Sequence, residues 1–221
     1  MVDPILITGA ARSGTSLTAG ILSKCGVDLG KTCGATPYNK KGQFENEDVR
    51  NSITKPHLIY IGADPMGQDP LPQTQDILPI FNLRELVLSI YSKQTRSNRP
   101  WAIKGAKVCL MWKAWRQGFP EAVWVLVRRK RADIVASCMR TPFMKARKTE
   151  KAWEEWVDYH EESFKDIKYC GAKVVEFFPD SIVKGETRPA QNMVKQCGLE
   201  WNQKAVMEFV DAELWKGANG K

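Results

Sequence analysis

The stretch ILITGAARSGTS, residues 5–16, decides how this chain folds. Its first four residues favour a β-strand over Ile5–Thr8, and because they are mostly apolar at successive positions, the strand should be covered on both sides. A glycine-containing turn follows, and the pattern then predicts a helix over Thr15–Lys24 that stops at Gly26. Such a turn brings backbone N–H groups and the positive end of a helix together. We therefore expect Gly9–Ser16 to form an anion-binding loop.

Further β-rich runs occur along the chain and alternate with helix-like stretches. The expected strands are Ile5–Thr8, Trp101–Ile103, Ala122–Val127 and Ala172–Phe177. The expected helices are Thr15–Lys24, a stretch from Asn46, Ile77–Lys93, Arg131–Arg140, Lys148–Tyr169 and two shorter ones near the end. The alternation predicts an α/β fold in three layers, α/β/α, with a P-loop-like parallel sheet flanked by helices on both faces.

Length and composition favour one domain over residues 1–221. The chain has 221 residues, of which 43% are hydrophobic, enough for one sizeable core. It contains no apolar run of the roughly 18 to 20 residues that a membrane-spanning helix needs, and its start has no basic region before an apolar run. Its six cysteines form no CxxC pair, which favours reduced thiols over disulfides or a zinc site. We expect a cytoplasmic protein without a membrane partner.

The positive charge is concentrated in the middle of the chain. The formal net charge is +8, and residues 96–148 hold fourteen Lys or Arg against only Glu121 and Asp133. Such a stretch attracts anions. Two kinds of ligand fit it: a polyanion such as nucleic acid, or a compact ligand that carries several phosphate or sulfate groups.

The turn at Gly9–Ser16 nearly matches the nucleotide-binding pattern GxxxxGK followed by Ser or Thr. Thr15, however, stands where that pattern needs its lysine, so a conventional ATPase or GTPase is disfavoured. Arg12 offers a guanidinium that can point into the loop and bind a tetrahedral anion instead. The alternative is purely structural, since any tight strand-to-helix turn can require Gly9 and Gly14.

A second motif follows the strand expected at Ala122–Val127. Arg128 and Arg129 come directly after it, and Ser137 stands eight residues beyond Arg129 on an expected helix. The carboxyl ends of strands are where open α/β sheets bind ligands. A magnesium-nucleotide enzyme favours a carboxylate there, whereas this chain offers arginines, so we expect an anion site without a metal. A solvated basic turn is the alternative.

Together, RSGTS (residues 12–16) and FPEAVWVLVRRKRADIVAS (residues 119–137) resemble the two segments by which the sulfotransferase family binds 3'-phosphoadenosine 5'-phosphosulfate (PAPS). The resemblance implies that the 5'-phosphosulfate is held by Arg12, Ser13, Gly14, Thr15 and Ser16. It also implies that Arg129 and Ser137 hold the 3'-phosphate, and their spacing excludes Arg128. The family fold and PAPS as the sulfuryl donor follow as expectations.

Two shorter segments extend the resemblance to bacterial-type members. They are GQFEN at residues 42–46 and WAIK at residues 101–104. Related sequences often continue K-D-P-R from the lysine, whereas here Gly105, Ala106 and Lys107 follow Lys104. The chain also has no GxxGxxK-like segment near its end, so no donor contact is assigned there.

Sulfuryl transfer moves a charged group in line between two oxygens, so catalysis should rest on positioning and on cations. We expect Arg12 and Lys104 to stabilise the charge. Glu45 is the candidate general base, because family members that lack a histidine base carry a glutamate in this region, while His57 and His160 lie outside any Lys-x-His motif. Alternatively, Glu45 stabilises the start of the helix that follows it.

Two other functions fit parts of the sequence. A P-loop kinase-like protein that binds a magnesium nucleotide shares the strand, loop and helix. A nucleic-acid-binding module explains the charge but not the ordered pair of motifs. The sulfotransferase interpretation explains both, and it implies a small-molecule, glycan or peptide acceptor that carries a hydroxyl or amine, with no nucleic-acid partner.

Overall fold

The strand that precedes the glycine-rich turn lies inside a parallel sheet. A computed structural model describes residues 2–95 and 99–217; Arg96, the first residue of the basic stretch, lies outside them. Within these residues the sheet has four parallel strands in the order β2-β1-β3-β4. The strands are β1 (Ile5–Thr8), β2 (Ala102–Lys104), β3 (Val123–Val127) and β4 (Lys173–Phe177). Ile7 pairs with Lys104 on one side and with Val125 on the other, so three strands end at one edge.

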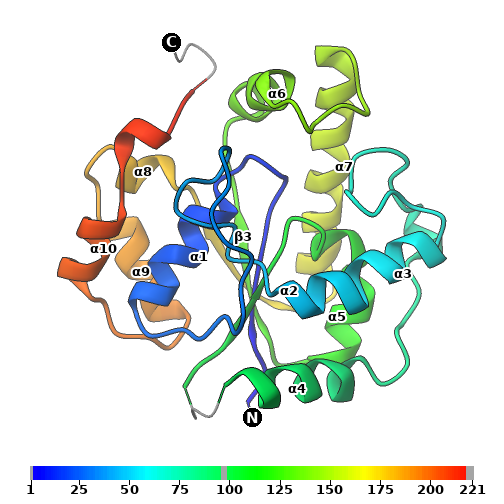
Figure 1. The fold of residues 1–221 in the computed structure, drawn as a ribbon, viewed down its shortest axis with the longest axis horizontal. Helices are drawn as coiled ribbons and strands as arrows, with labels where there is room; N and C mark the ends of the chain where they lie inside the picture. Colours follow the sequence, from blue (N-terminus) through cyan, green and yellow to red (C-terminus); the bar gives the residue numbers. More distant parts are fainter. Residues whose placement is uncertain (1, 96–98, 218–221) are drawn as a thin grey trace.

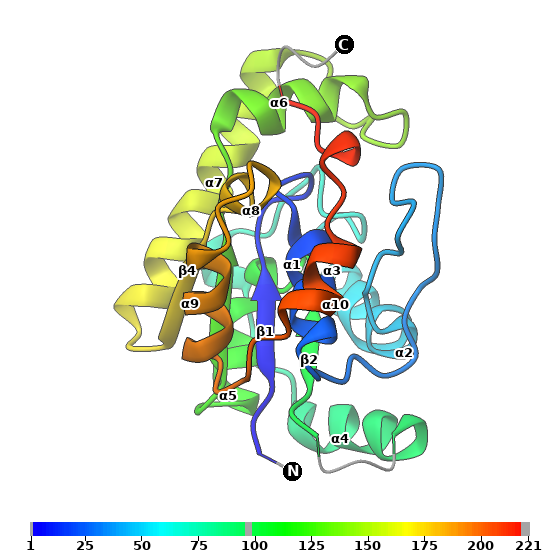
Figure 2. The ribbon, with the colours of Figure 1, turned by 90° about the vertical axis from the view of Figure 1, so that its left-hand side faces the viewer.

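Helices cover both faces of this sheet, as Figures 1 and 2 show. On one side lie α1 (Thr15–Lys24), α8 (Asp180–Val183), α9 (Arg188–Gln196) and α10 (Gln203–Phe209). On the other lie α2 (Glu47–Val49), α3 (Lys55–Tyr60), α4 (Leu83–Gln94), α5 (Trp112–Gly118) and α7 (Glu150–Tyr169), with α6 (Arg131–Arg140) packed on α7. A π-helical turn, Arg50–Thr54, joins α2 to α3, and 3-10 turns lie at Thr74–Asp76, Cys109–Met111 and Ala212–Leu214. The expected three-layer α/β fold is confirmed.

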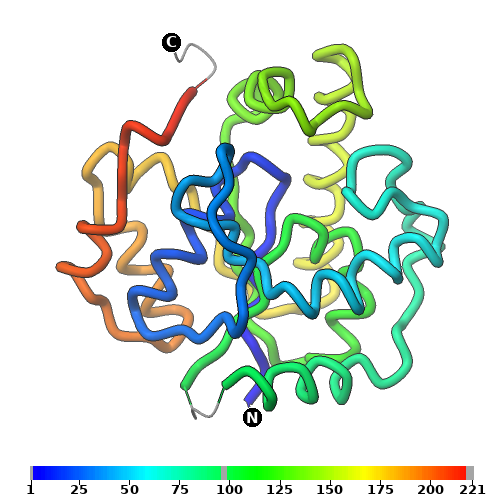
Figure 3. Tube along the Cα trace, in the orientation of Figure 1, coloured from blue at the N-terminus to red at the C-terminus, as the bar shows by residue number. Residues whose placement is uncertain are grey.

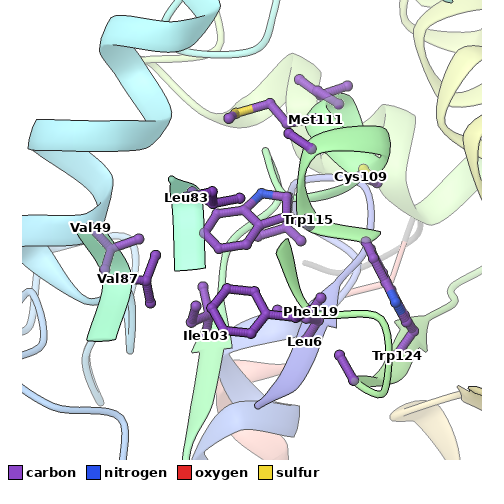
Figure 4. Close-up of a cluster of buried hydrophobic side chains, with 14 of the residues drawn as sticks. Leu6, Val49, Leu83, Val87, Ile103, Cys109, Met111, Trp115, Phe119 and Trp124 are labelled. Atoms are coloured by element: carbon purple, nitrogen blue, oxygen red, sulfur yellow. The ribbon is translucent and has the colours of Figure 1, made fainter. Parts of the chain in front are cut away.

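The central strand is apolar on both faces because alternate side chains enter different cores. Leu6 belongs to the core beneath α4 and α5, together with Trp115 and Trp124, which are fully buried. Figure 4 shows these side chains packed around Leu6 and Phe119. Ile5 and Ile7 enter the opposite core against α1 and α9. The run ILIT is therefore a doubly covered strand, as its sequence predicts.

Most predicted boundaries agree with the structure within two residues, but α4 does not. The sequence pattern predicts this helix from Ile77, whereas it begins at Leu83. Pro79 disfavours helical backbone at the residue before it. Asn82 then adopts a left-handed conformation with φ of 55°, which starts the helix afresh. The sequence reasoning also missed α5, a short helix that packs against α4 and buries Ala114 and Trp115 in the core.

Two expectations from composition can be set beside the structure. All six cysteines are free thiols. In the part of the chain that the structure describes, no helix combines the length and apolar character needed to cross a membrane.

A stability test follows from Tyr91, a fully buried residue of α4. Its hydroxyl donates to the Ala102 carbonyl at 2.6 Å and lies 3.2 Å from the Leu29 carbonyl. Tyr91→Phe removes the hydrogen bonds without a large cavity, so we expect a loss of about 1 kcal/mol in the free energy of unfolding. Urea denaturation measures this. Tyr169→Phe, at a side chain that is 95% exposed, is the control and should change little; an equal effect of both variants would contradict the assignment.

Candidate functional site

The turn at Gly9–Ser16 lies at the carboxyl end of β1, at the start of α1. Gly14 precedes the helix with φ of 102°, a conformation that favours glycine, and no side chain caps the helix start. A Cβ on residue 9 would lie 2.5 Å from the carbonyl oxygen of Val127, the last residue of β3, so only glycine fits at this position. The first N–H groups of α1 are left for a ligand, which is the arrangement that binds phosphate and sulfate groups.

Ser13 supplies a direct sign that this loop is made for a polar ligand. The residue is fully buried, and its hydroxyl has no hydrogen-bond partner within the described residues. A buried hydroxyl without a partner costs free energy, of the order of 1–3 kcal/mol. An oxyanion held by the loop would satisfy it. The loop residues therefore fit the phosphosulfate group that the sequence analysis assigns to them.

The two motifs meet through Arg12. Its backbone is left-handed, with φ of 71°, and its Nε donates to the Ser137 hydroxyl at 3.0 Å. Its carbonyl accepts a hydrogen bond from Nη1 of Arg129 at 2.9 Å. Arg12 thus points toward the second motif rather than into the turn. The structure brings Arg12 together with Arg129 and Ser137, each of which lies more than a hundred residues from it in the chain.

Arg128 lies on a different side of the sheet from Arg129. Its guanidinium forms ion pairs with Glu161 of α7 and Glu176 of β4, and it covers the Phe164 ring at 5.4 Å. Successive residues of an extended chain point in opposite directions. The spacing argument, which selects Arg129 and excludes Arg128, therefore agrees with the directions of the two side chains.

Sequence reasoning missed a C-terminal segment that covers Arg129. The Trp215 ring lies 4.2 Å from the Arg129 guanidinium, and its Nε1 donates to Asp180 at 2.9 Å. The same ring packs on Gly14, where a Cβ would lie 2.6 Å from it. Arg129 also donates to the carbonyl of Lys216. The available signal was Trp215 beside Lys216, an aromatic and a cation close to the end of a chain that has basic motifs elsewhere.

Burial makes this arginine pair costly without an anion. It lowers the pKa of both Arg12 and Arg129 from the usual value, and repulsion from Arg140 lowers both further, while Asp133, 4.0 Å from Arg129 Nε, and Asp180 offset part of the effect at Arg129. An arginine nevertheless stays protonated in proteins. Two cations are therefore held close together and largely away from water, which favours a ligand with negative charge.

Glu45 lies in a second charged cluster beside the loop. The Ser16 hydroxyl donates to the Gln43 carbonyl at 3.2 Å, which holds the segment before α2 against the start of α1. Figure 3 traces this segment from α1 up to the loop end of the sheet and back to α2. Glu45 Oε1 lies 3.2 Å from Lys104 Nζ, at the end of β2. Lys104 is the last residue of that strand, and Glu45 and Lys104 are both largely buried.

Three cations keep Glu45 ionised. Burial alone would raise the pKa of its carboxyl, but attraction to Lys104, Lys107 and Arg50 outweighs this and lowers the pKa from 4.5 to about 2. The start of α2 is stabilised by Asn46 instead of Glu45, because the Asn46 side chain accepts a hydrogen bond from the Val49 N–H at 3.1 Å. Glu45 is thus an ion-pair partner in this state.

The two histidines occupy ordinary helical positions. His57 lies in α3. His160 is buried in α7, its Nδ1 lies 2.8 Å from the Trp156 carbonyl, and burial lowers its pKa to about 4. Across residues 2–95 and 99–217, no cluster of three or more His, Cys, Asp or Glu side chains is placed to hold a metal ion.

The fold is similar to that of solved sulfotransferases. Sulfotransferase STF9 from Mycobacterium avium matches with a TM-score of 0.53 and 11% sequence identity, over 93% of this chain and 66% of that one, just under two thirds of its length. Sulfotransferase STF1 from Mycobacterium tuberculosis H37Rv gives a TM-score of 0.46 at 11% identity, over 95% of this chain and 72% of that one. No family model and no curated protein sequence matches. At this identity the likeness concerns the fold, and the chain has a sulfotransferase fold.

The lowered pKa of Glu45 predicts a pH effect on stability. A carboxyl whose pKa falls from 4.5 unfolded to about 2 folded stabilises the protein above about pH 4.5 and loses this contribution as pH falls toward 2. Glu45→Gln should remove this part of the pH dependence. It should also lower the free energy of unfolding at pH 7 by about 3–5 kcal/mol, because Lys104 keeps its buried charge without a partner.

Denaturation at a series of pH values measures both effects. Glu154→Gln, which changes an exposed carboxylate of α7, is the control. A Glu45→Gln protein that is as stable as the parent at pH 7, with the same pH profile, would show that the ion pair is not formed.

Proposed function

We propose that this chain is a sulfotransferase that moves a sulfuryl group from PAPS to a hydroxyl or amine of an acceptor. The observation that carries the proposal is the junction of the two motifs: Arg12 donates to Ser137 and accepts from Arg129. The sulfotransferase fold supports it, and so does the unpartnered Ser13 hydroxyl in the loop. The proposed acceptor is a small molecule, a glycan or a peptide.

The residues divide the donor's negative charges between two places. The N–H groups at the start of α1, with Ser13, Thr15 and Ser16, would bind the 5'-phosphosulfate. Arg129 and Ser137 would bind the 3'-phosphate, for which a guanidinium offers paired donors. The carbonyl of Lys216 now accepts from Arg129, so a phosphate would take its place and the C-terminal segment would shift.

The chain's own cations supply the charge stabilisation that the transfer needs. PAPS supplies an activated sulfuryl group on a good leaving phosphate. Lys104, beside the loop, would neutralise charge that develops on the bridging and equatorial oxygens, whereas the Arg12 guanidinium faces Ser137 and would add positive charge on the 3'-phosphate side. The acceptor oxygen, or the nitrogen of an amine, would form the new bond to sulfur while the S–O bond to the 5'-phosphate breaks, and the acceptor's proton would pass to Glu45. The products would be a sulfate ester, or a sulfamate from an amine, and 3'-phosphoadenosine 5'-phosphate.

Glu45 suits this role only when its cations are engaged by ligands. With a pKa of about 2 its carboxylate is a weak base. A sulfonate bound to Lys104 would compete for that cation and raise the proton affinity of Glu45. The base would therefore gain strength when the donor is bound.

Calorimetric titration with 3'-phosphoadenosine 5'-phosphate tests the donor site. The parent protein should bind it without added metal, and more tightly than ATP or Mg-ATP. Arg129→Ala should weaken binding at least about a hundredfold, since a buried charge-assisted contact is lost. Arg128→Ala is a matched control on the neighbouring residue and should bind almost as the parent does. Absence of binding, or preference for Mg-ATP, would contradict the proposal and favour a kinase-like protein.

Glu45→Gln tests the base. Transfer from radiolabelled PAPS to an acceptor found by screening should slow by about 10²- to 10⁴-fold, because general base catalysis is lost. The affinity for 3'-phosphoadenosine 5'-phosphate should stay nearly unchanged, which also shows that the variant is folded. Glu47→Gln, at the half-exposed start of α2, should transfer at the parental rate. Parental turnover in Glu45→Gln would remove this residue as the base.

A further inference from the structure

The cluster around Glu45 contains more positive charge than the proposed reaction requires. Three cations lie within ion-pair distance of this one carboxylate: Lys104 at 3.2 Å, Arg50 at 3.8 Å and Lys107 at 3.9 Å. No second acid lies at ion-pair distance from them in the described part of the chain. Their side chains are 5%, 25% and 11% exposed, so water screens them poorly. Nearby Lys55 adds a further positive charge.

The two oxygens of Glu45 divide these cations into two sets. Oε1 faces Lys104, which ends the strand beside the phosphate loop. Oε2 faces both Arg50 and Lys107. A sulfonate bound by the loop would engage Lys104, as proposed above. Arg50 and Lys107 contact the other oxygen, and binding of the donor gives these two cations no role.

A small cavity of about 10 Å³, the room that about one water needs, lies where these side chains converge, so a ligand anion would enter only as the ion pairs rearrange. Its lining includes Glu45, Arg50, Thr54, Lys104, Lys107 and Val108. One wall is the π-helical turn Arg50–Thr54, a form of helix that is rare and occurs frequently at functional sites. The polar contacts of Arg50 besides Glu45 are to neutral groups, the side chains of Gln43 at 3.0 Å and Asn51 at 3.3 Å. Within this lining Glu45 is the one acidic side chain, and it faces three cations: Arg50, Lys104 and Lys107.

We propose that Arg50 and Lys107 bind an anionic group of the acceptor, a carboxylate, sulfate or phosphate close to the hydroxyl that is sulfated. The inference rests on the proposed function and names the substrate class of the same site. Both cations lie on the Oε2 side of the base, so the acceptor's anion would bind them on that side while its hydroxyl faces the donor. An acceptor without an anionic group would leave these two largely buried cations with only one oxygen of Glu45 to share.

Acceptor binding also has a consequence for the base. Arg50 and Lys107 help to hold Glu45 in its ionised, weakly basic form. An anion that engages these two cations weakens their attraction for Glu45, which then takes up a proton more readily. A neutral acceptor gives no such effect. Specificity for anionic acceptors would thus appear in the rate of transfer as well as in binding.

The test uses the full chain saturated with 3'-phosphoadenosine 5'-phosphate. It is titrated in a calorimeter with two matched pairs of probes: methyl glucuronide against methyl glucoside, and 3-hydroxybenzoate against 3-hydroxybenzamide. The anionic member of at least one pair should bind at least about tenfold more tightly than its neutral partner. Lys107→Met and Arg50→Gln should each remove most of this preference. Lys195→Met makes the same charge change on the exposed surface of α9 and should retain it.

The affinity of each variant for 3'-phosphoadenosine 5'-phosphate separates this inference from the proposed function. If the parent fails to bind that nucleotide, the proposed function fails, and this inference fails with it. If the parent binds it but neither anionic probe binds better than its neutral partner, the acceptor inference alone is wrong. A tenfold or greater loss of nucleotide affinity in Lys107→Met or Arg50→Gln would also overturn it, because the cations would then belong to the donor site.

Discussion

The parallel pairing of β1 with β2 and β3 fixes where the residues of the candidate site lie. Ile7 lies opposite both Lys104 and Val125, so these strands finish at one edge of the sheet. The phosphate loop leaves from the end of β1, Lys104 ends β2, and Arg129 follows β3 by two residues. A slip of one residue in either pairing would turn these side chains to the other face. Register therefore sets the geometry of the whole candidate site.

Local patterns predicted much of this arrangement, and tertiary contacts account for the rest. The four strands, α1 and α6 could be found because burial on both faces leaves apolar runs and because helix boundaries carry local signals. The start of α4 was missed because Asn82 breaks the helical pattern through its backbone conformation. The direction of Arg12 and the position of Trp215 over Arg129 depend on contacts between residues distant in sequence, which the local patterns used for the helices and strands do not describe.

Two centres of positive charge give the candidate site its character. The first is Arg12 with Arg129, whose contacts are the carbonyls of Arg12 and Lys216, the Ser137 hydroxyl and, at 4.0 Å, the Asp133 carboxylate. The second surrounds Glu45, which now occupies the place that ligand anions would take. In both centres the positive charge is balanced by fewer or weaker contacts than an anionic ligand would make. We therefore expect ligand binding to rearrange ion pairs and to leave the sheet unchanged.

A crystal structure of the complex with 3'-phosphoadenosine 5'-phosphate would show whether this edge of the sheet binds the donor. We expect the 5'-phosphate on the N–H groups at the start of α1 and the 3'-phosphate on Arg129 and Ser137. We also expect the Lys216 carbonyl to be displaced from Arg129. A nucleotide bound away from Arg129, or a 3'-phosphate that faces solvent while Lys216 keeps its contact, would contradict the assignment of this edge of the sheet as a PAPS site.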